Sequence, residues 1–242
     1  PTLSDDLTAY LEYAREKGLK SVLVTNGQKL AKALYVEELK AAGLTHVAMS
    51  LYSHDPEIQG FLTGNAQSRE NFAAAAANIA AAGDIYLDAV ISINKYNAFH
   101  LSETVRYLNK NFPHITHMVF NNMDPLMNRA ADNPDTIPML NDMDIELDRA
   151  VAFMRDMDIT VRIERVPLCY MGGFEHCSTE TRRIVKNEKC RILFLDEKGE
   201  VDKREGDVFY GKAECCEICY LKEICAGLYS MDTHYSSKEL FP

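Results

Sequence analysis

The chain has 242 residues, of which 47% are hydrophobic and 26% are charged, and its formal net charge is −10. This composition is that of an ordinary globular protein, and the length fits one large domain or one domain with a small appendage. An acidic chain without a basic block is a poor partner for nucleic acid, and the sequence has no membrane-length apolar run or signal peptide, so we expect a cytoplasmic protein with no nucleic-acid or membrane partner.

Apolar residues alternate between helical and strand spacing along the first half of the chain. The spacing predicts helices over residues 4–17, 28–42, 68–82 and 101–111, and strands over residues 21–25, 46–51, 86–93 and 117–120. Ser4 is the expected N-cap of the first helix, and Gly43 and Gly83 are expected to end later ones. Single helices between nearly continuous apolar strands predict parallel βαβ units.

The pattern changes after residue 121. Residues 122–141 contain aspartate, asparagine and three prolines, which predicts a loop over the carboxyl end of the sheet. One more helix around residues 147–154 and one more strand over residues 160–164 follow. Residues 191–201 have the pattern of a β-hairpin that turns at Lys198-Gly199.

All seven cysteines lie in residues 167–242, which we treat as a region distinct from residues 1–166. Cys216 and Cys219 form a CxxC pair, and Cys225 follows after five residues. A tight turn brings both thiolates of such a pair to one metal centre. An odd count in a reducing compartment argues against complete disulfide pairing. Taken alone, the cysteines favour a structural zinc site.

Four stretches of the chain carry a resemblance to a known family. They are Pro1–Leu7, Lys20–Gly27 with its Thr-Asn-Gly end, Leu44–Leu51, and Val90–Asn97. In this order and spacing they resemble radical S-adenosylmethionine (radical SAM) enzymes that carry a C-terminal SPASM or twitch-like auxiliary iron–sulfur domain. The resemblance covers almost the whole chain. It implies an incomplete parallel (β/α)6 barrel that lacks its first βα unit and second strand, over residues 1–166, with the cysteine-rich extension behind it.

The resemblance implies that SAM binds at the carboxyl ends of the strands, near Asn26, Ser50, Asn94 and Asn97. Each of these residues also has an ordinary structural explanation, as a turn residue or as part of the core. The family's chemistry needs a CxxxCxxC loop for a catalytic [4Fe–4S] cluster, whereas the first cysteine here is Cys169. We therefore expect an N-terminally truncated piece of a longer enzyme, with no catalytic residue of its own and no SAM cleavage by itself.

The resemblance also makes the C-terminal cysteines the expected ligands of one auxiliary [4Fe–4S] cluster, with zinc as the alternative. The expected ligands are Cys190, Cys216, Cys219 and Cys225. Cys190 is included because it precedes the predicted hairpin, as the family's first auxiliary ligand often does. Cys215 is an alternative to Cys216, and Cys169 or Cys177 is a candidate for a second site.

For the full-length parent, the resemblance implies an oxidoreductase or maturase. Such an enzyme cleaves SAM to a 5′-deoxyadenosyl radical, which abstracts hydrogen from a peptide or small-molecule substrate. The alternative from another class is a non-catalytic module that binds zinc or an iron–sulfur cluster. The sequence predicts neither the bond that is formed nor the oligomeric state.

Overall fold

The computed structural model describes residues 1–126, 128–188, 191–193, 200–202 and 209–242. Its centre is a sheet in which all neighbouring strands are parallel and the spatial order follows the chain. The strands are β1 (Val22–Thr25), β2 (His46–Ser50), β3 (Tyr86–Ile93), β4 (His117–Asn122) and β5 (Thr160–Glu164). The predicted α/β class and parallel sheet are confirmed, while the finer description as an incomplete (β/α)6 barrel stays a prediction.

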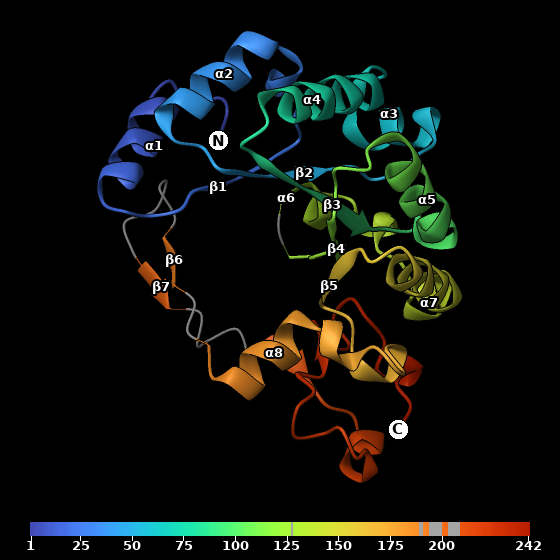
Figure 1. The fold of residues 1–242 in the computed structure, drawn as a ribbon. Helices are drawn as coiled ribbons and strands as arrows, with labels where there is room; N and C mark the ends of the chain where they lie inside the picture. The colour runs from blue at the N-terminus through green and yellow to red at the C-terminus, as the bar shows by residue number, and fades with distance from the viewer. Residues whose placement is uncertain (127, 189–190, 194–199, 203–208) are drawn as a thin grey trace.

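Helices α1 (Leu7–Glu16), α2 (Ala33–Ala42), α3 (Pro56–Thr63), α4 (Ser68–Ala82), α5 (Leu101–Asn111) and α7 (Leu140–Asp156) lie along the outer side of the arc that the sheet forms (Figure 1). Two further helices, α6 (Asn128–Asp132) after β4 and α8 (Thr179–Lys186) after β5, lie elsewhere. Within the described residues, none of them combines the length and apolar character that a membrane crossing requires.

Two predicted helices differ from the structure at their starts. The first begins at Leu7, and the Ser4 hydroxyl accepts the Asp6 N–H at 3.3 Å instead of capping a helix at residue 4. The second is divided, because Lys32 is extended (φ −93°, ψ 110°) between a short 3-10 turn, Lys29–Ala31, and α2. Gly43 ends α2 in the left-handed conformation, as predicted.

Helix α3 lies between the predicted strand 46–51 and the predicted helix 68–82, where the sequence pattern predicted no helix. The Asp55 carboxylate caps it by accepting the N–H groups of Glu57 at 2.8 Å and Ile58 at 3.2 Å. Pro56 fits the first helical position, where no intrahelical N–H bond is lost. The Asp55-Pro56 pair, which is also common in turns, is therefore a helix start here. Helix α6 likewise lies inside the predicted loop of residues 122–141.

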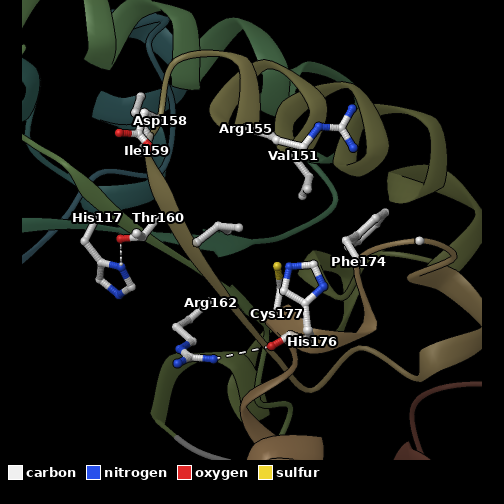
Figure 2. A pocket seen from close by; sticks show the side chains of 12 residues that line it. His117, Val151, Arg155, Asp158, Ile159, Thr160, Arg162, Phe174, His176 and Cys177 are labelled. Atoms are coloured by element: carbon white, nitrogen blue, oxygen red, sulfur yellow. Dashed lines mark hydrogen bonds between the residues drawn. The ribbon is translucent and has the colours of Figure 1, made fainter.

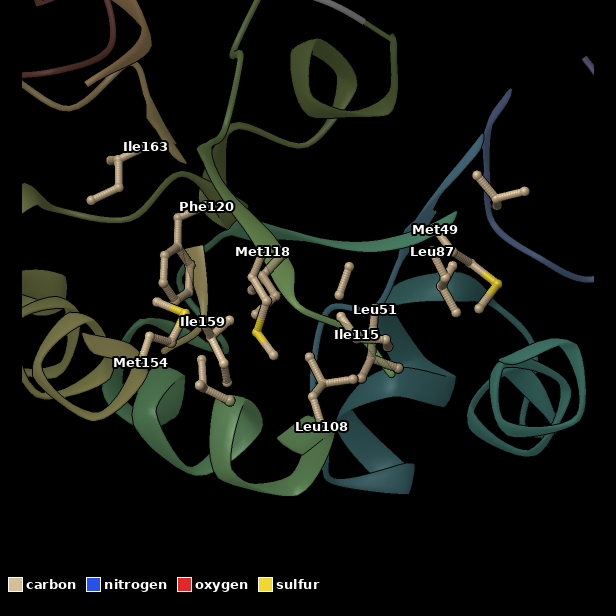
Figure 3. Close-up of a cluster of buried hydrophobic side chains, with 14 of the residues drawn as sticks. Met49, Leu51, Leu87, Leu108, Ile115, Met118, Phe120, Met154, Ile159 and Ile163 are labelled. Carbon is tan, nitrogen blue, oxygen red and sulfur yellow. The ribbon is translucent and has the colours of Figure 1, made fainter. Parts of the chain in front are cut away.

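The hydrophobic core lies between the sheet and the helices on its outer side (Figure 3). Met118 and Phe120 of β4 are fully buried there, together with Leu108 of α5 and Met154 of α7. Burying one such side chain contributes about 1.5–3 kcal/mol to the free energy of unfolding. One face of the sheet is thus used for packing, and the alternate residues of each strand face the inside of the arc.

Polar pairs cross that inner face near the amino ends of the strands. His46 Nε2 lies 2.7 Å from Asp88 Oδ2, and His117 Nδ1 lies 2.7 Å from Thr160 Oγ1. Burial lowers the pKa of His117, and the negative charge of the nearby Asp88 opposes this in part. These contacts join β2 to β3 and β4 to β5 through side chains as well as through the backbone.

Two small antiparallel ladders follow the main sheet. β6 (Arg191–Leu193) pairs with β7 (Glu200–Asp202), which confirms the predicted hairpin, although its turn at Lys198-Gly199 lies outside the described residues. β8 (Tyr210–Gly211) pairs with β9 (Leu228–Tyr229) and encloses the densest part of the cysteine sequence. The proposed boundary between residues 1–166 and 167–242 stays a prediction.

Candidate functional site

Asn26 and Ser50 lie at the carboxyl ends of two neighbouring strands. Asn26 directly follows β1 and is exposed, and its side-chain oxygen accepts the Gln28 N–H at 3.2 Å. Ser50 is the last residue of β2 and is half-buried. Because Thr25 pairs with Met49 in the parallel ladder, the two strands end at the same level. The structure therefore places these two predicted residues at one edge of the sheet.

Asn94 and Asn97 are also at this edge, but both are buried, with 1% or less of their surface exposed. The Asn97 side-chain oxygen accepts the Asn94 N–H at 2.8 Å, and its amide group donates to the carbonyls of Ser92 at 2.8 Å and Tyr52 at 2.7 Å. The Asn94 side-chain oxygen accepts the Tyr96 N–H at 2.9 Å. These side-chain amides hold the turn after β3 in place. The groups that were predicted to contact SAM are therefore already engaged in hydrogen bonds within the protein.

Arg165, just beyond β5, is a residue of this edge that the sequence analysis did not identify. Its φ of 60° is in the left-handed region, which is uncommon for residues other than glycine. The guanidinium donates to the Asn122 carbonyl at 2.9 Å and also contacts the Asn121 side chain, while the backbone N–H donates to Glu180 at 3.1 Å. These bonds stabilise the unusual backbone and place a cation at the ends of β4 and β5.

Three tyrosines of the C-terminal region pack around Arg165. Their hydroxyls donate to Glu180 (Tyr210, 3.0 Å), to Asp124 (Tyr229, 3.1 Å) and to the Met123 carbonyl (Tyr235, 2.7 Å). The Arg165 guanidinium lies 5.7 Å from the centre of the Tyr229 ring. Burial raises the pKa of Tyr229 to about 12 and raises the pKa of Tyr210 and Tyr235 as well, so all three hydroxyls remain donors at neutral pH.

We expect Tyr235→Phe to lower the free energy of unfolding by about 1–3 kcal/mol. Tyr235 is 2% exposed, and the change leaves the partly buried Met123 carbonyl and the Asn122 side-chain oxygen without its hydroxyl. Urea denaturation measures the loss. The control, Tyr13→Phe, alters a side chain that is 61% exposed and should change stability by no more than about 0.5 kcal/mol. Equal effects would contradict a structural role for the Tyr235 hydroxyl.

Four thiols of the C-terminal region affect one another's pKa. Burial raises the pKa of Cys169 to about 11, and the negative charges of Cys225 and Cys216 add to the increase. Burial also raises the pKa of Cys216, with contributions from Cys215 and Cys225. These charge effects connect Cys169 with Cys216 and Cys225, although Cys169 is distant from them in sequence. All described cysteines are free thiols.

The predicted ligand set is only partly visible. Cys190 lies outside the described residues. Cys225 Sγ accepts the Gly227 N–H at 3.3 Å. Thiolates are the donor type that zinc and iron–sulfur clusters take. In the described part of the chain, however, no three cysteine, histidine or acidic side chains are arranged to hold a metal ion, so the cluster and its ligands stay a prediction.

Comparisons with known proteins give a distant likeness. No family model matches the sequence, and no curated protein matches it. The structure is similar to a domain of pyruvate-formate lyase-activating enzyme from Bacteroides vulgatus ATCC 8482, with a TM-score of 0.47 and 13% identity over 66% of this chain and 94% of that one. A protein named "putative lyase/mutase" from Burkholderia cenocepacia J2315 has a TM-score of 0.37 and 13% identity over 66% of this chain and 52% of that one. Likenesses this distant carry no argument about function.

Proposed function

We propose that the chain is part of a cytoplasmic radical SAM oxidoreductase or maturase, which cleaves SAM to a 5′-deoxyadenosyl radical and abstracts hydrogen from a substrate. One observation carries the proposal. The Thr25-Asn26-Gly27 turn and Ser50, which resemble the family's strand ends, lie side by side at the carboxyl edge of a parallel sheet. Open α/β sheets bind ligands beyond this edge.

The four predicted residues have different parts in this proposal. The exposed amide of Asn26 and the half-buried hydroxyl of Ser50 contact polar groups of SAM. Asn94 and Asn97 position the turn beside them, through the hydrogen bonds that connect the ends of β2 and β3. A peptide is our first choice of substrate, because family members with auxiliary domains often modify peptides, and a small molecule is the second.

The C-terminal thiols are proposed to hold one auxiliary [4Fe–4S] cluster. Cys216, Cys219 and Cys225 would supply three ligands. The fourth is Cys190 on the sequence argument, while the effect of Cys216 and Cys225 on the pKa of Cys169 makes Cys169 the alternative. A zinc site at the same thiols, in a non-catalytic module, is the second candidate function. It is favoured by the lack of a CxxxCxxC motif in these 242 residues.

The reading frame upstream of Pro1 tests the proposal. We expect it to encode a CxxxCxxC motif followed by Gly-Gly-Glu, and a start codon directly before Pro1 would refute the enzyme assignment. The longer protein, reconstituted with iron and sulfide and reduced in the presence of SAM, should form 5′-deoxyadenosine. The 242-residue chain alone should form none.

In the longer protein, Asn26→Ala and Ser50→Ala should each weaken SAM binding by about 3–10-fold, because each removes a hydrogen bond of about 1 kcal/mol. Isothermal titration with SAM measures the change. Ser21→Ala is the matched control, because Ser21 lies just before β1, at the opposite end of the sheet. A loss of affinity that is the same for Ser21→Ala as for the other two variants would show that SAM does not bind at this edge.

A further inference from the structure

Strand β5 has a free edge in the described structure. The Thr160 N–H donates to the Thr116 carbonyl of the chain before β4 at 2.9 Å, so Thr160 and Arg162 direct their backbone groups toward β4. Along a strand these directions alternate, and Val161 therefore directs its N–H and carbonyl away from β4. No hydrogen bond joins these two groups to another described residue.

The free edge is short because the chain itself covers the next part of β5. Ile163 forms a parallel bridge with Ser178, and the Arg165 N–H is bound by Glu180. The strand thus changes at Ile163 from an uncovered edge to a covered one. Unpaired edges are templates for another strand, and proteins usually protect them.

A cavity of about 620 Å³ lies along the uncovered part of the edge (Figure 2). Its lining includes Val151 and Arg155 of α7, Val161 and Arg162 of β5, and Phe174 and Cys177 of the following loop. The cavity therefore combines unpaired backbone groups with side chains from three segments. This volume accommodates a few residues of an extended chain.

The two sides of β5 offer different chemistry to that cavity. Figure 2 shows Arg162 and His117 on one side of the strand, and Val151, Phe174 and Cys177 on the other. The last three side chains are 5–7% exposed, and they give that side of the cavity an apolar wall. Because the side chains of an added strand also alternate in direction, every second one would meet the apolar side and the others would meet Arg162.

The charged groups of the lining are mainly basic. Arg162 makes one long contact, from Nη1 to the His176 carbonyl at 3.5 Å, which leaves most of its five donors for another group. Arg155 and His176 are exposed at the rim. Asp158 is the acidic residue of the lining, and Glu175 lies near Cys177. The two arginines and the one carboxylate of the lining give it a net charge of +1 with the histidines neutral, on a chain whose net charge is −10.

We propose that the edge of β5 binds an extended peptide segment as an additional strand of the sheet. Acidic side chains of the peptide face Arg162, its apolar side chains cover Val151 and Phe174, and its backbone pairs with Val161. Main-chain bonds supply affinity in this binding mode, and alternate side chains supply selectivity. The site is remote from the carboxyl edge where Asn26 lies, so the proposal does not depend on the radical SAM assignment.

A second copy of this chain is a less suitable occupant. Antiparallel pairing of two β5 edges would place the basic groups of one copy, Arg162 among them, against those of the other, and like charges on paired strands are unfavourable. A peptide with acidic and apolar side chains instead places opposite charge beside Arg162. Charge complementarity therefore favours a heterologous peptide.

A fluorescent six-residue peptide that alternates glutamate and valine is the probe for titration against the 242-residue chain. We expect saturable binding, followed by fluorescence anisotropy, and slower hydrogen exchange of the Val161 amide in the complex. A peptide of the same sequence with alternate backbone nitrogens methylated cannot pair fully and should bind about tenfold more weakly, which corresponds to the loss of one or two hydrogen bonds. Equal binding of the two peptides, or no saturable binding, overturns the proposal.

Variants of the protein test the same contacts that the modified peptide tests. Arg162→Gln should weaken binding of the glutamate peptide several-fold more than Lys110→Gln, which removes an equal charge from the exposed side of α5. Val161→Pro removes the edge N–H without touching the bonds to β4, and it should weaken binding more than Val161→Ala. Equal effects of Arg162→Gln and Lys110→Gln, or a dimer that the peptide does not dissociate, would also overturn the proposal.

Discussion

Gly27→Ala is expected to lower the free energy of unfolding by about 2–4 kcal/mol. Gly27 has a φ of +76°, where an added Cβ costs roughly 1 kcal/mol. That Cβ would also lie 2.9 Å from Met49 Cγ and still closer to Met49 Sδ. Met49 is fully buried, and overpacking of this kind costs about 1–3 kcal/mol. Urea denaturation measures the loss.

Gly64→Ala is the matched control for this prediction. Gly64 has a φ of +65°, and no atom lies within 4 Å of its added Cβ, so it should lose only the backbone term of about 1 kcal/mol. A double-mutant cycle of Gly27→Ala with Met49→Ala should show a favourable coupling, because the smaller side chain removes the clash. If the two glycine variants lose the same stability, Met49 does not restrict position 27.

Gly27→Ala should have a functional effect as well. The turn it disturbs positions Asn26, so in the longer protein the affinity for SAM should fall together with the stability.

Cys225→Ser is expected to abolish the auxiliary metal centre. Cys225 belongs both to the predicted ligand set and to the group of neighbouring thiols that includes Cys169 and Cys216. A serine hydroxyl is a poor replacement for a thiolate, which iron–sulfur clusters require. Anaerobic reconstitution with iron and sulfide, followed by iron analysis and by the absorption at about 400 nm that thiolate-bound clusters give, measures the loss.

Cys177→Ser is the control, since Cys177 is buried beside Arg162 and Glu175 and not among those thiols. It should retain the cluster. Cys169→Ser and Cys190→Ser then identify the fourth ligand, because only the variant that lacks a true ligand loses iron. Stoichiometric zinc without the absorption band would replace the cluster by a zinc site. A Cys225→Ser protein with unchanged iron content would contradict the assignment.

The parallel sheet could be predicted because each strand is a short apolar run between helices of amphipathic spacing. The predicted helix boundaries were less accurate where local hydrogen bonds determine where a helix begins. Asp55-Pro56 is compatible with both a turn and a capped helix start, and only the bonds from Asp55 to Glu57 and Ile58 distinguish the two. The extended conformation of Lys32 has no signal in its side chain.

The site could be predicted only in part, for a related reason. Asn26 and Ser50 could be placed because the carboxyl ends of parallel strands share one edge. The left-handed backbone of Arg165 depends on partners far away in sequence, and spacing does not reveal them. The same holds for the approach of Cys169 to Cys225, which depends on how the C-terminal region folds back against β5.

The sequential order of the strands has a consequence for how the protein is made. Each strand of the main sheet pairs with the strand synthesised immediately before it, so no strand has to wait on the ribosome for a later partner. Paired strands are therefore separated by only one or two α-helices and their loops, which favours rapid folding for a parallel sheet. The sheet can grow from β1 toward β5 as translation proceeds. A slow step at β1 and β2 would delay every later pairing, whereas one at β5 would delay only the last.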